Sequence, residues 1–149
     1  MKAMRRVLAA AVGMLVVGTV AACSESITAN PNRSDSWGSG SYHLLSVNGS
    51  ALPYTMRDDA TGRVLLTGGE MSCDRTTFTQ VLRFSDVGPS GLATSRSTTV
   101  QGTMTVTGSR VIFRPSTGGE FEGTVAGNRI AYTIQGNMGP LTFIFLKDY

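Results

Sequence analysis

The stretch TVTGSRVI (residues 105–112) decides the fold, because TVAGNRIA (residues 124–131) nearly repeats it further along the chain. In each copy, Gly followed by Ser or Asn separates two short runs in which apolar and polar residues alternate. A two-residue turn of type I′ or II′ with this composition joins two antiparallel strands and fixes their register. Both stretches therefore predict antiparallel hairpins with one buried face.

The two turns also predict which side chains lie opposite one another on the buried face. With Gly108-Ser109 and Gly127-Asn128 as the turns, the inward pairs are Met104 with Phe113, Val106 with Val111, Val125 with Ile130, and Phe121 with Ile134. Upstream, a turn at Asp74-Arg75 predicts that Met71 lies opposite Phe78. At the C-terminal end, both alternating sets of LTFIFL (residues 141–146) are apolar. This last strand is therefore either central in the sheet or partly covered on its outer side.

The same period of two continues through most of residues 41–149, and no segment has a helical period. We expect strands near residues 41–47, 52–57, 63–72, 76–85, 98–107, 110–114, 119–126, 129–135 and 141–147. About eight or nine short strands in sequential hairpins favour an all-β, small antiparallel up-and-down barrel. A two-sheet sandwich is the alternative. Residues 86–97 (DVGPSGLATSRS) form the one long loop that we expect, and such loops are often functional.

This layout resembles the small lipocalin-like barrels that occur as bacterial lipoproteins. The resemblance is carried by SYHLLSVNGSALP (residues 41–53), by the two repeated hairpins and by LTFIFLKDY (residues 141–149). It implies a β-barrel domain that carries a small apolar ligand. The chain is shorter than is usual for lipocalins.

The N-terminal residues have the pattern of a secretory signal. Lys2, Arg5 and Arg6 precede the apolar run Val7–Val20, and two alanines lead to Cys23. A charged start, a short apolar segment and a small-residue exit are typical of a signal peptide. The run is shorter than the ~20 residues that a membrane-spanning helix needs, which also favours a cleaved signal. A single uncleaved anchor is the alternative.

The last residues of this segment, Val20-Ala21-Ala22-Cys23, resemble the lipobox of bacterial lipoproteins. The resemblance implies a signal peptide over residues 1–22, cleavage before Cys23 and lipidation of that cysteine. Residues 23–40 would then be a lipid-anchored flexible tether, and residues 41–149 the single domain. By the same analogy, Ser24 favours the outer membrane, facing the periplasm, in a bacterium that has two membranes. A disulfide between Cys23 and Cys73 is the alternative.

The net charge of the processed chain argues against nucleic acid as a partner. Removal of Lys2, Arg5 and Arg6 leaves ten of the 13 basic residues, and the ten acidic residues all lie beyond Cys23. Such a balance lacks the basic patch that a nucleic-acid-binding surface requires. It also lacks the cluster of Lys and Arg that recognises anionic lipids.

The inward-facing residues suggest two functions for the barrel interior. The inferred set is Met71, Phe78, Leu82, Phe84, Met104, Val106, Val111, Phe113, Phe121, Val125, Ile130, Tyr132, Ile134, Phe143 and Phe145. An eight-stranded barrel is either filled by its own side chains or holds one small ligand. The candidate ligand-binding residues are Phe78, Gln80, Phe84, Phe113, Phe121, Tyr132, Phe143 and Phe145. Gln80 and the Tyr132 hydroxyl are the polar groups that converge on this interior.

The sequence offers little for catalysis. His43 is the single histidine, and neither a metal-ligand pattern nor a nucleophile elbow is present. We therefore expect no enzyme, no metal and no cofactor. We expect Cys73 to be buried and the chain to be a monomer. The leading hypothesis is a non-enzymatic envelope lipoprotein that contacts another envelope component, through loops such as residues 86–97. A carrier of a small apolar ligand is the alternative.

Overall fold

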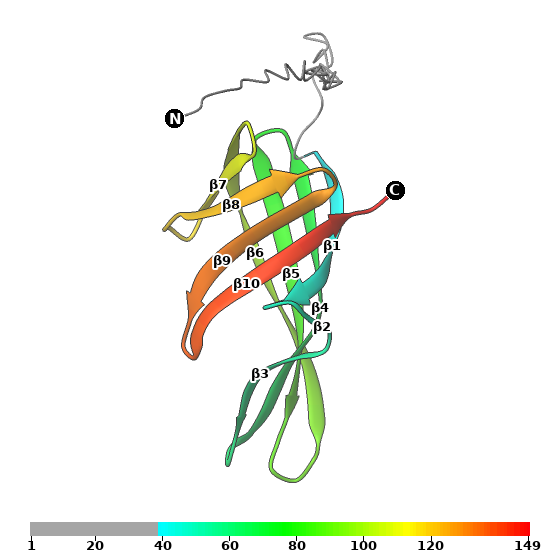
Figure 1. Cartoon of the computed structure of the whole chain (residues 1–149). Helices are drawn as coiled ribbons and strands as arrows, with labels where there is room; N and C mark the ends of the chain where they lie inside the picture. Colours follow the sequence, from blue (N-terminus) through cyan, green and yellow to red (C-terminus); the bar gives the residue numbers. More distant parts are fainter. Residues whose placement is uncertain (1–38) are drawn as a thin grey trace, which may run out of the picture. The chain divides into compact units, whose positions relative to one another are not determined.

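The structure, a computed structural model, describes residues 39–149 and consists of β-strands joined by turns (Figure 1). Its ten strands are β1 (Gly40–Val47), β2 (Ser50–Ala51), β3 (Tyr54–Asp59), β4 (Gly62–Asp74), β5 (Thr77–Val87), β6 (Ala93–Thr107), β7 (Arg110–Pro115), β8 (Phe121–Ala126), β9 (Arg129–Gly136) and β10 (Gly139–Lys147). All of the pairings are antiparallel. Within the described residues, no helix is long and apolar enough to cross a membrane.

Eight of these strands close into an up-and-down barrel. Strands β4 to β10 pair in sequence order, β10 pairs with β1, and β1 pairs with β4 to complete the ring. Strands β2 and β3 lie outside the ring, at the two ends of the sheet. The prediction of an antiparallel up-and-down barrel is therefore confirmed, and the sandwich alternative is not formed.

The two glycine turns set the register that the sequence predicted. Met104 lies opposite Phe113, Val106 opposite Val111, and Val125 opposite Ile130. Gly108 and Gly127 have φ angles of 61° and 60°, as the first central residue of a type II′ turn requires. The ladder between β8 and β9 ends at Gly123 and Tyr132, short of the pair between Phe121 and Ile134 that we expected.

The turn between β4 and β5 differs from the prediction by one position. The strands end at Asp74 opposite Thr77, so the two turn residues are Arg75 and Thr76 rather than Asp74 and Arg75. Met71 consequently lies opposite Gln80, and Cys73 lies opposite Phe78. A slip of the pairing by two residues leaves every side chain on its predicted face, because strands have a period of two.

The prediction of a long loop at residues 86–97 is wrong. Strand β5 extends to Val87 and β6 begins at Ala93, so only residues 88–92 form the turn. All of the residues from Ala93 to Thr99 are exposed, on both faces of the strand. Because neither face is buried, the sequence has no alternation of apolar and polar residues there, and the segment resembled a loop. Pairing with β5 and the β-propensity of Thr hold it extended instead.

This long hairpin forms part of an extension beyond the barrel. In Figure 1, β3, the first part of β4, the end of β5 and the start of β6 continue below the ring of strands. We call these paired segments, residues 54–66 and 84–97, the extension. Register shifts between Thr55 and Arg57 in β3, and between Leu66 and Gly68 in β4, mark β-bulges near its upper end. Bulges of this kind bend a strand and increase its twist.

The barrel encloses the hydrophobic core. The buried residues are Tyr42, Leu44, Val47, Leu66, Met71, Cys73, Phe78, Met104, Val111, Phe113, Val125, Ile130, Tyr132, Phe143 and Phe145. Every residue of the predicted inward set is either buried or packed against this core. Strand β10 pairs with β1 on one side and β9 on the other, so it is central, one of the two positions that its apolar faces allowed.

Candidate functional site

Aromatic rings occupy the interior of the barrel. Phe113, which is fully buried, stacks on Phe121 with 4.8 Å between ring centroids and meets Phe78 edge-on at 5.0 Å. Tyr132 lies 4.8 Å from Phe121 and stacks on Phe143 at 5.3 Å. Such pairs stabilise by about 0.5–1.5 kcal/mol each beyond the apolar area that they bury. The rings thus form one connected cluster that joins β5, β7, β8, β9 and β10.

One polar contact crosses this apolar interior. The side-chain amide of Gln80 on β5 donates a hydrogen bond to the hydroxyl of Tyr132 on β9. Gln80 is the one buried polar residue of the described chain, with 4% of its surface exposed. Burial raises the pKa of Tyr132, while the bond from Gln80 acts in the opposite direction. The hydroxyl therefore stays neutral and serves as an acceptor that pairs the Gln80 amide.

The two ends of the barrel differ in how completely they are packed. Along β5, Phe78 and Gln80 are buried, whereas Leu82 and Phe84 on the same face are only half-buried. The same decrease in burial occurs along β9, from Tyr132 to Ile134. We define the mouth as the half-buried apolar side chains at the end from which the extension projects: Tyr54, Leu82, Phe84, Val100, Ile134 and Leu141.

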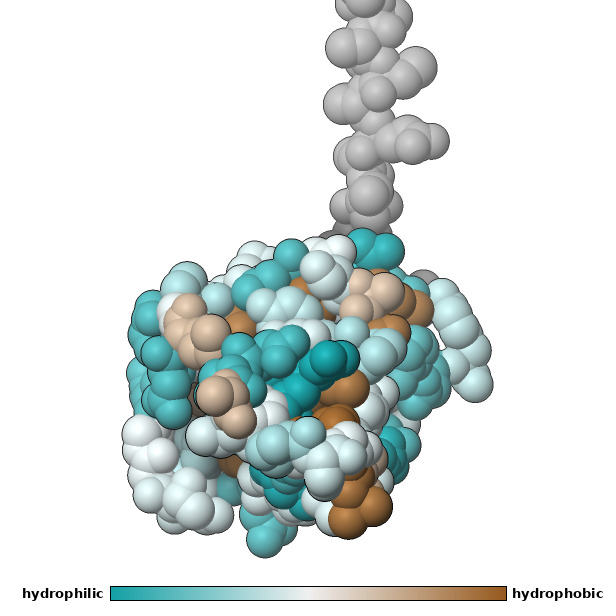
Figure 2. All heavy atoms as spheres, turned by 90° about the horizontal axis from the view of Figure 1, so that it is seen from below, coloured by the Kyte–Doolittle hydropathy of each residue, from teal (hydrophilic) through white to brown (hydrophobic). Residues whose placement is uncertain are grey.

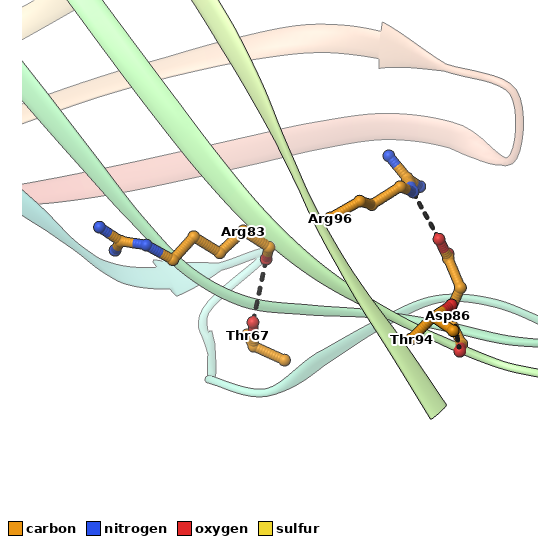
Figure 3. A network of polar contacts seen from close by, with 5 residues as sticks. All are labelled: Thr67, Arg83, Asp86, Thr94 and Arg96. Carbon is orange, nitrogen blue, oxygen red and sulfur yellow. Dashed lines mark hydrogen bonds and ion pairs between the residues drawn. The ribbon is translucent and has the colours of Figure 1, made fainter. Parts of the chain in front are cut away.

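A charged pair lies beside the mouth, at the start of the extension. Arg96 on β6 lies directly opposite Phe84, and its guanidinium carbon is 4.4 Å from the centre of that ring. The Nε of Arg96 donates to the Oδ2 of Asp86 at 2.6 Å, and Figure 3 shows this pair with the bond from Thr94 to the Asp86 carbonyl. A cation over a ring face is attracted by its quadrupole. Arg96 therefore covers one face of the Phe84 ring.

Figure 3 also shows how the β4 bulge is held. Thr67 is the extra residue in β4, between Leu66 opposite Phe84 and Gly68 opposite Arg83. Its hydroxyl donates to the carbonyl oxygen of Arg83 across the strand pair, at 3.1 Å. This bond ties the bulged residue to β5 at the level where the extension leaves the barrel.

Most charges on the outer surface are paired, and three of the pairs join neighbouring strands. The ion pairs are Arg57 with Asp59, Arg63 with Asp58, Arg83 with Glu70, Arg110 with Glu122, and Arg114 with Glu120. The Arg110 guanidinium, bonded to Glu122 at 2.6 Å, lowers the pKa of that carboxyl. Exposed pairs of this kind contribute little to stability, because water screens them. They leave a surface of interspersed charge.

Seen from the end where the extension projects, the surface is mainly hydrophilic, with small and separate hydrophobic patches (Figure 2). Two hairpin tips add exposed apolar residues. Leu92 lies at the β5–β6 turn and is 73% exposed, and Met138 lies at the β9–β10 turn and is 75% exposed.

His43 and Cys73 have structural surroundings. The exposed imidazole of His43 makes a 2.6 Å contact from Nδ1 to Oδ1 of Asp148, which holds the C-terminal residues against β1. Cys73 is buried, as predicted, and burial raises the pKa of its thiol to about 11. The thiol is therefore protonated and poorly nucleophilic at neutral pH. Among residues 39–149, no three His, Cys, Asp or Glu side chains gather closely enough to hold a metal ion.

The structure brings most of the predicted site residues together. Six of the eight belong to the aromatic cluster: Phe78, Phe113, Phe121, Tyr132, Phe143 and Phe145. Gln80 joins this cluster through its bond to Tyr132. Phe84 is separate from it and lies at the mouth under Arg96. The candidate lipidation residue Cys23, and nearly all of the expected tether at residues 23–40, lie outside the described residues.

Sequence reasoning missed Arg96 and Asp86, because both fell in the segment that resembled a loop. Their spacing around a Gly-Pro turn, with polar residues between, gives no sign that they meet. Comparisons with protein-family models, with curated proteins and with solved structures find no match to this chain.

Proposed function

We propose that this chain is a lipid-anchored protein of the bacterial cell envelope, and that its barrel is a non-enzymatic interaction module. The anchor would be Cys23, after removal of residues 1–22, and in a bacterium with two membranes the outer one would hold it, facing the periplasm. The support for the anchor is the sequence Val20-Ala21-Ala22-Cys23 after a charged and apolar start. The module needs no cofactor and no nucleic acid, and its partner is another envelope component.

One observation carries the interaction function. The barrel interior is occupied by its own aromatic rings, whereas the extension exposes both faces of β6 from Ala93 to Thr99. These residues are exposed, so they add little to the stability of the fold through burial. Contact with a partner gives such a surface a use.

The anchor is tested by expressing the full chain in a bacterium and measuring the mass of the product. We expect the mass of residues 23–149 plus that of the acyl chains, in the membrane fraction. A Cys23→Ser variant should lack the added mass and leave that fraction. Full-length wild-type protein, or a processed protein without added mass, would contradict the lipid anchor.

The interaction module is tested by photo-cross-linking in living cells. A photoreactive residue at Leu92 or Arg63, both on the extension, should give an adduct with a second envelope protein, identified by mass spectrometry. The same residue at Thr105, which is exposed on the barrel wall, is the matched control. The proposal fails if the extension positions give no adduct beyond that of the control.

A carrier of a small apolar ligand is the second candidate, and the half-buried side chains at the mouth favour it. A shallow ligand would replace water over Phe84, Leu82 and Ile134 without entering the filled interior. We would titrate the purified protein with N-phenylnaphthylamine, whose fluorescence rises in apolar surroundings. Binding that is lost in Phe84→Ala and kept in Val81→Ala, a change on the opposite face of β5, would support the carrier. Equal fluorescence in both variants would exclude the mouth as the ligand site.

A further inference from the structure

The free strand edges at β2, β3 and β6 differ in how they are protected. β2 has only two residues. β3 carries the bulge between Thr55 and Arg57, followed by three charged residues up to Asp59. Short length, bulges and charge are the usual ways in which proteins prevent an edge strand from pairing with another chain.

The third edge belongs to β6 and lacks most of these features. β7 pairs with β6 only from Gly102 onward, and no other described strand pairs with β6 between Ala93 and Val100. On its other side, β6 pairs with β5 without interruption from Ala93 opposite Val87 to Thr103 opposite Thr77. The free segment ATSRSTTV contains no Pro, no Lys and no bulge. It is a regular strand with one side unpaired.

The backbone of this segment is oriented for pairing. The carbonyl of Gln101 accepts a bond from the amide of Ser116, on the β7 side, whereas the amide of Met104 donates to Thr76, on the β5 side. Backbone groups alternate in direction along an antiparallel strand. The odd-numbered residues Ala93, Ser95, Ser97 and Thr99 therefore direct their N–H and C=O groups to the free edge.

Arg96 is the only charge on the segment, and it does not block the edge. Its side chain is engaged on the inner face of the sheet by Asp86 and by the ring of Phe84. The remaining side chains are small or β-branched, and Thr and Val are strongly represented in strands.

We propose that this β6 edge pairs with the same edge of a second copy of the chain, antiparallel, about a two-fold axis at Ser97. A two-fold axis perpendicular to a sheet keeps every side chain on its own face. Residues that lie opposite each other are therefore an even number of positions apart, and one residue lies opposite its own copy at the axis. The turn at residues 88–92 and the bond from Ser116 to Gln101 limit the free edge to residues 93–100. The middle of this segment lies between Arg96 and Ser97, so the axis passes beside one of these two residues.

Charge selects Ser97 rather than Arg96. An axis at Arg96 would place two guanidinium groups directly opposite each other, and like charges in that position destabilise a strand pair. With the axis at Ser97, Arg96 faces Thr98 of the second copy, Ser95 faces Thr99, and Thr94 faces Val100. The odd-numbered pairs then exchange backbone hydrogen bonds, and the two extensions form one continuous sheet. This dimer departs from the monomer that we expected from the sequence.

Cysteine cross-linking tests the register in the full chain. In the Ser97→Cys variant the new thiols meet at the axis, so mild oxidation of membranes from expressing cells should give a reducible band of twice the chain mass. In Ser95→Cys the two new thiols lie four residues apart along the paired strands, and that variant should remain at the mass of one chain. The buried Cys73 is present in both variants and in the wild-type control. Equal cross-linking of both variants, or none in Ser97→Cys, would overturn the proposal.

A second variant tests the dimer without oxidation. Ser97→Pro removes an N–H that points away from β5, so the hydrogen bonds between β5 and β6 are kept. In detergent extracts analysed by sedimentation, the wild-type chain should have twice the protein mass of Ser97→Pro, while circular dichroism shows that the variant is folded. A wild-type monomer, or a dimer that persists in Ser97→Pro, would contradict pairing at this edge. In the cross-linking test, a reducible band that joins the Ser97→Cys chain to a different protein would also contradict the dimer, and would identify a foreign strand as the occupant of the edge.

Discussion

Single residues decide how the polar groups of this barrel are satisfied. Gln80 has its amide inside an aromatic cluster, and the Tyr132 hydroxyl is its partner there. No buried side-chain nitrogen or oxygen of residues 39–149 lacks a hydrogen-bond partner. The cost of a buried amide is thus offset by a single tyrosine on the opposite wall.

Removal of the Tyr132 hydroxyl should show this dependence. We expect Tyr132→Phe to lower the free energy of unfolding by about 1–3 kcal/mol, because the Gln80 amide loses its acceptor. The double variant Gln80→Leu, Tyr132→Phe should recover part of the loss, since neither side chain then needs a partner. Urea denaturation of the four proteins measures the coupling. Additive losses would mean that the bond does not contribute as a pair.

Asp59 sets a pH dependence at the tip of the β3–β4 hairpin. Bonds from the hydroxyl of Thr61 at 2.5 Å and from its amide at 2.8 Å lower the pKa of Asp59 from its usual value. Because the folded pKa lies below the unfolded one, the stabilisation is complete above the unfolded pKa and is lost as pH falls through the folded pKa. An NMR titration of the carboxyl carbon should show Thr61→Ala moving this pKa upward, while Thr55→Ala leaves it in place. An unchanged pKa in Thr61→Ala would contradict the assignment.

At the scale of strands, glycine allows close approach between neighbours. A Cβ at Gly123 on β8 would lie 2.5 Å from the carbonyl oxygen of Ala131 and 2.9 Å from the Cβ of Tyr132. Glycine inside a strand often marks a sharp bend in a barrel. Here it lets β8 curve between β7 and β9.

We expect Gly123→Ala to destabilise the protein by at least about 1–3 kcal/mol, the usual cost of an overpacked core position. Gly68→Ala is the matched control, because the nearest atom to its new Cβ is an Arg83 nitrogen at 4.0 Å. Thermal unfolding followed by circular dichroism compares the two variants. Equal melting temperatures would mean that β8 shifts away without cost.

The aromatic cluster predicts unequal effects of two phenylalanines. Phe113→Ala removes a fully buried ring between Phe78 and Phe121, so we expect a loss of about 3–5 kcal/mol. Phe84→Ala removes a half-buried ring at the mouth and should cost clearly less. Chemical denaturation of both variants gives the comparison. A larger loss for Phe84 would place the main packing of the molecule at the extension.

At the scale of the whole molecule, the closed barrel and the extension differ in packing. The barrel has its residues alternately buried and exposed, while β6 from Ala93 to Thr99 is exposed throughout. Segments with few buried apolar contacts open locally at low free energy. The molecule therefore combines a packed barrel with a segment of β6 that its own core does not cover.

Hydrogen exchange should separate the two parts. In the monomeric Ser97→Pro variant, we expect amides of the β5–β6 tip, residues 84–97, to exchange faster than those of β9 and β10. Exchange measured by mass spectrometry on peptides resolves these regions. Protection in the wild-type protein that is absent from the variant would report pairing at the β6 edge, and uniform protection in both would contradict a weakly held extension.

The sequence by itself determined the all-β class, the two glycine hairpins and the inward direction of most core residues. These features depend on neighbours along the chain: a turn residue with positive φ, and an alternation that one buried face imposes. The slip at the β4–β5 turn changed partners without changing faces for this reason. Every phenylalanine of the core could be named from the sequence because each lies in such an alternating run. The buried residues Tyr42, Leu44, Val47 and Leu66 were not in the predicted inward set.

The tertiary structure alone decided what depends on contacts between distant segments. Ring closure by β1 and β4 joins segments that no turn connects, and the meeting of Gln80 with Tyr132 depends on the diameter of that ring. The extension was hidden because a strand exposed on both faces has no hydrophobic period, so Ala93 to Thr99 resembled a loop. Only its backbone pairing with β5 reveals the strand, the pair of Arg96 with Asp86, and the free edge beside them.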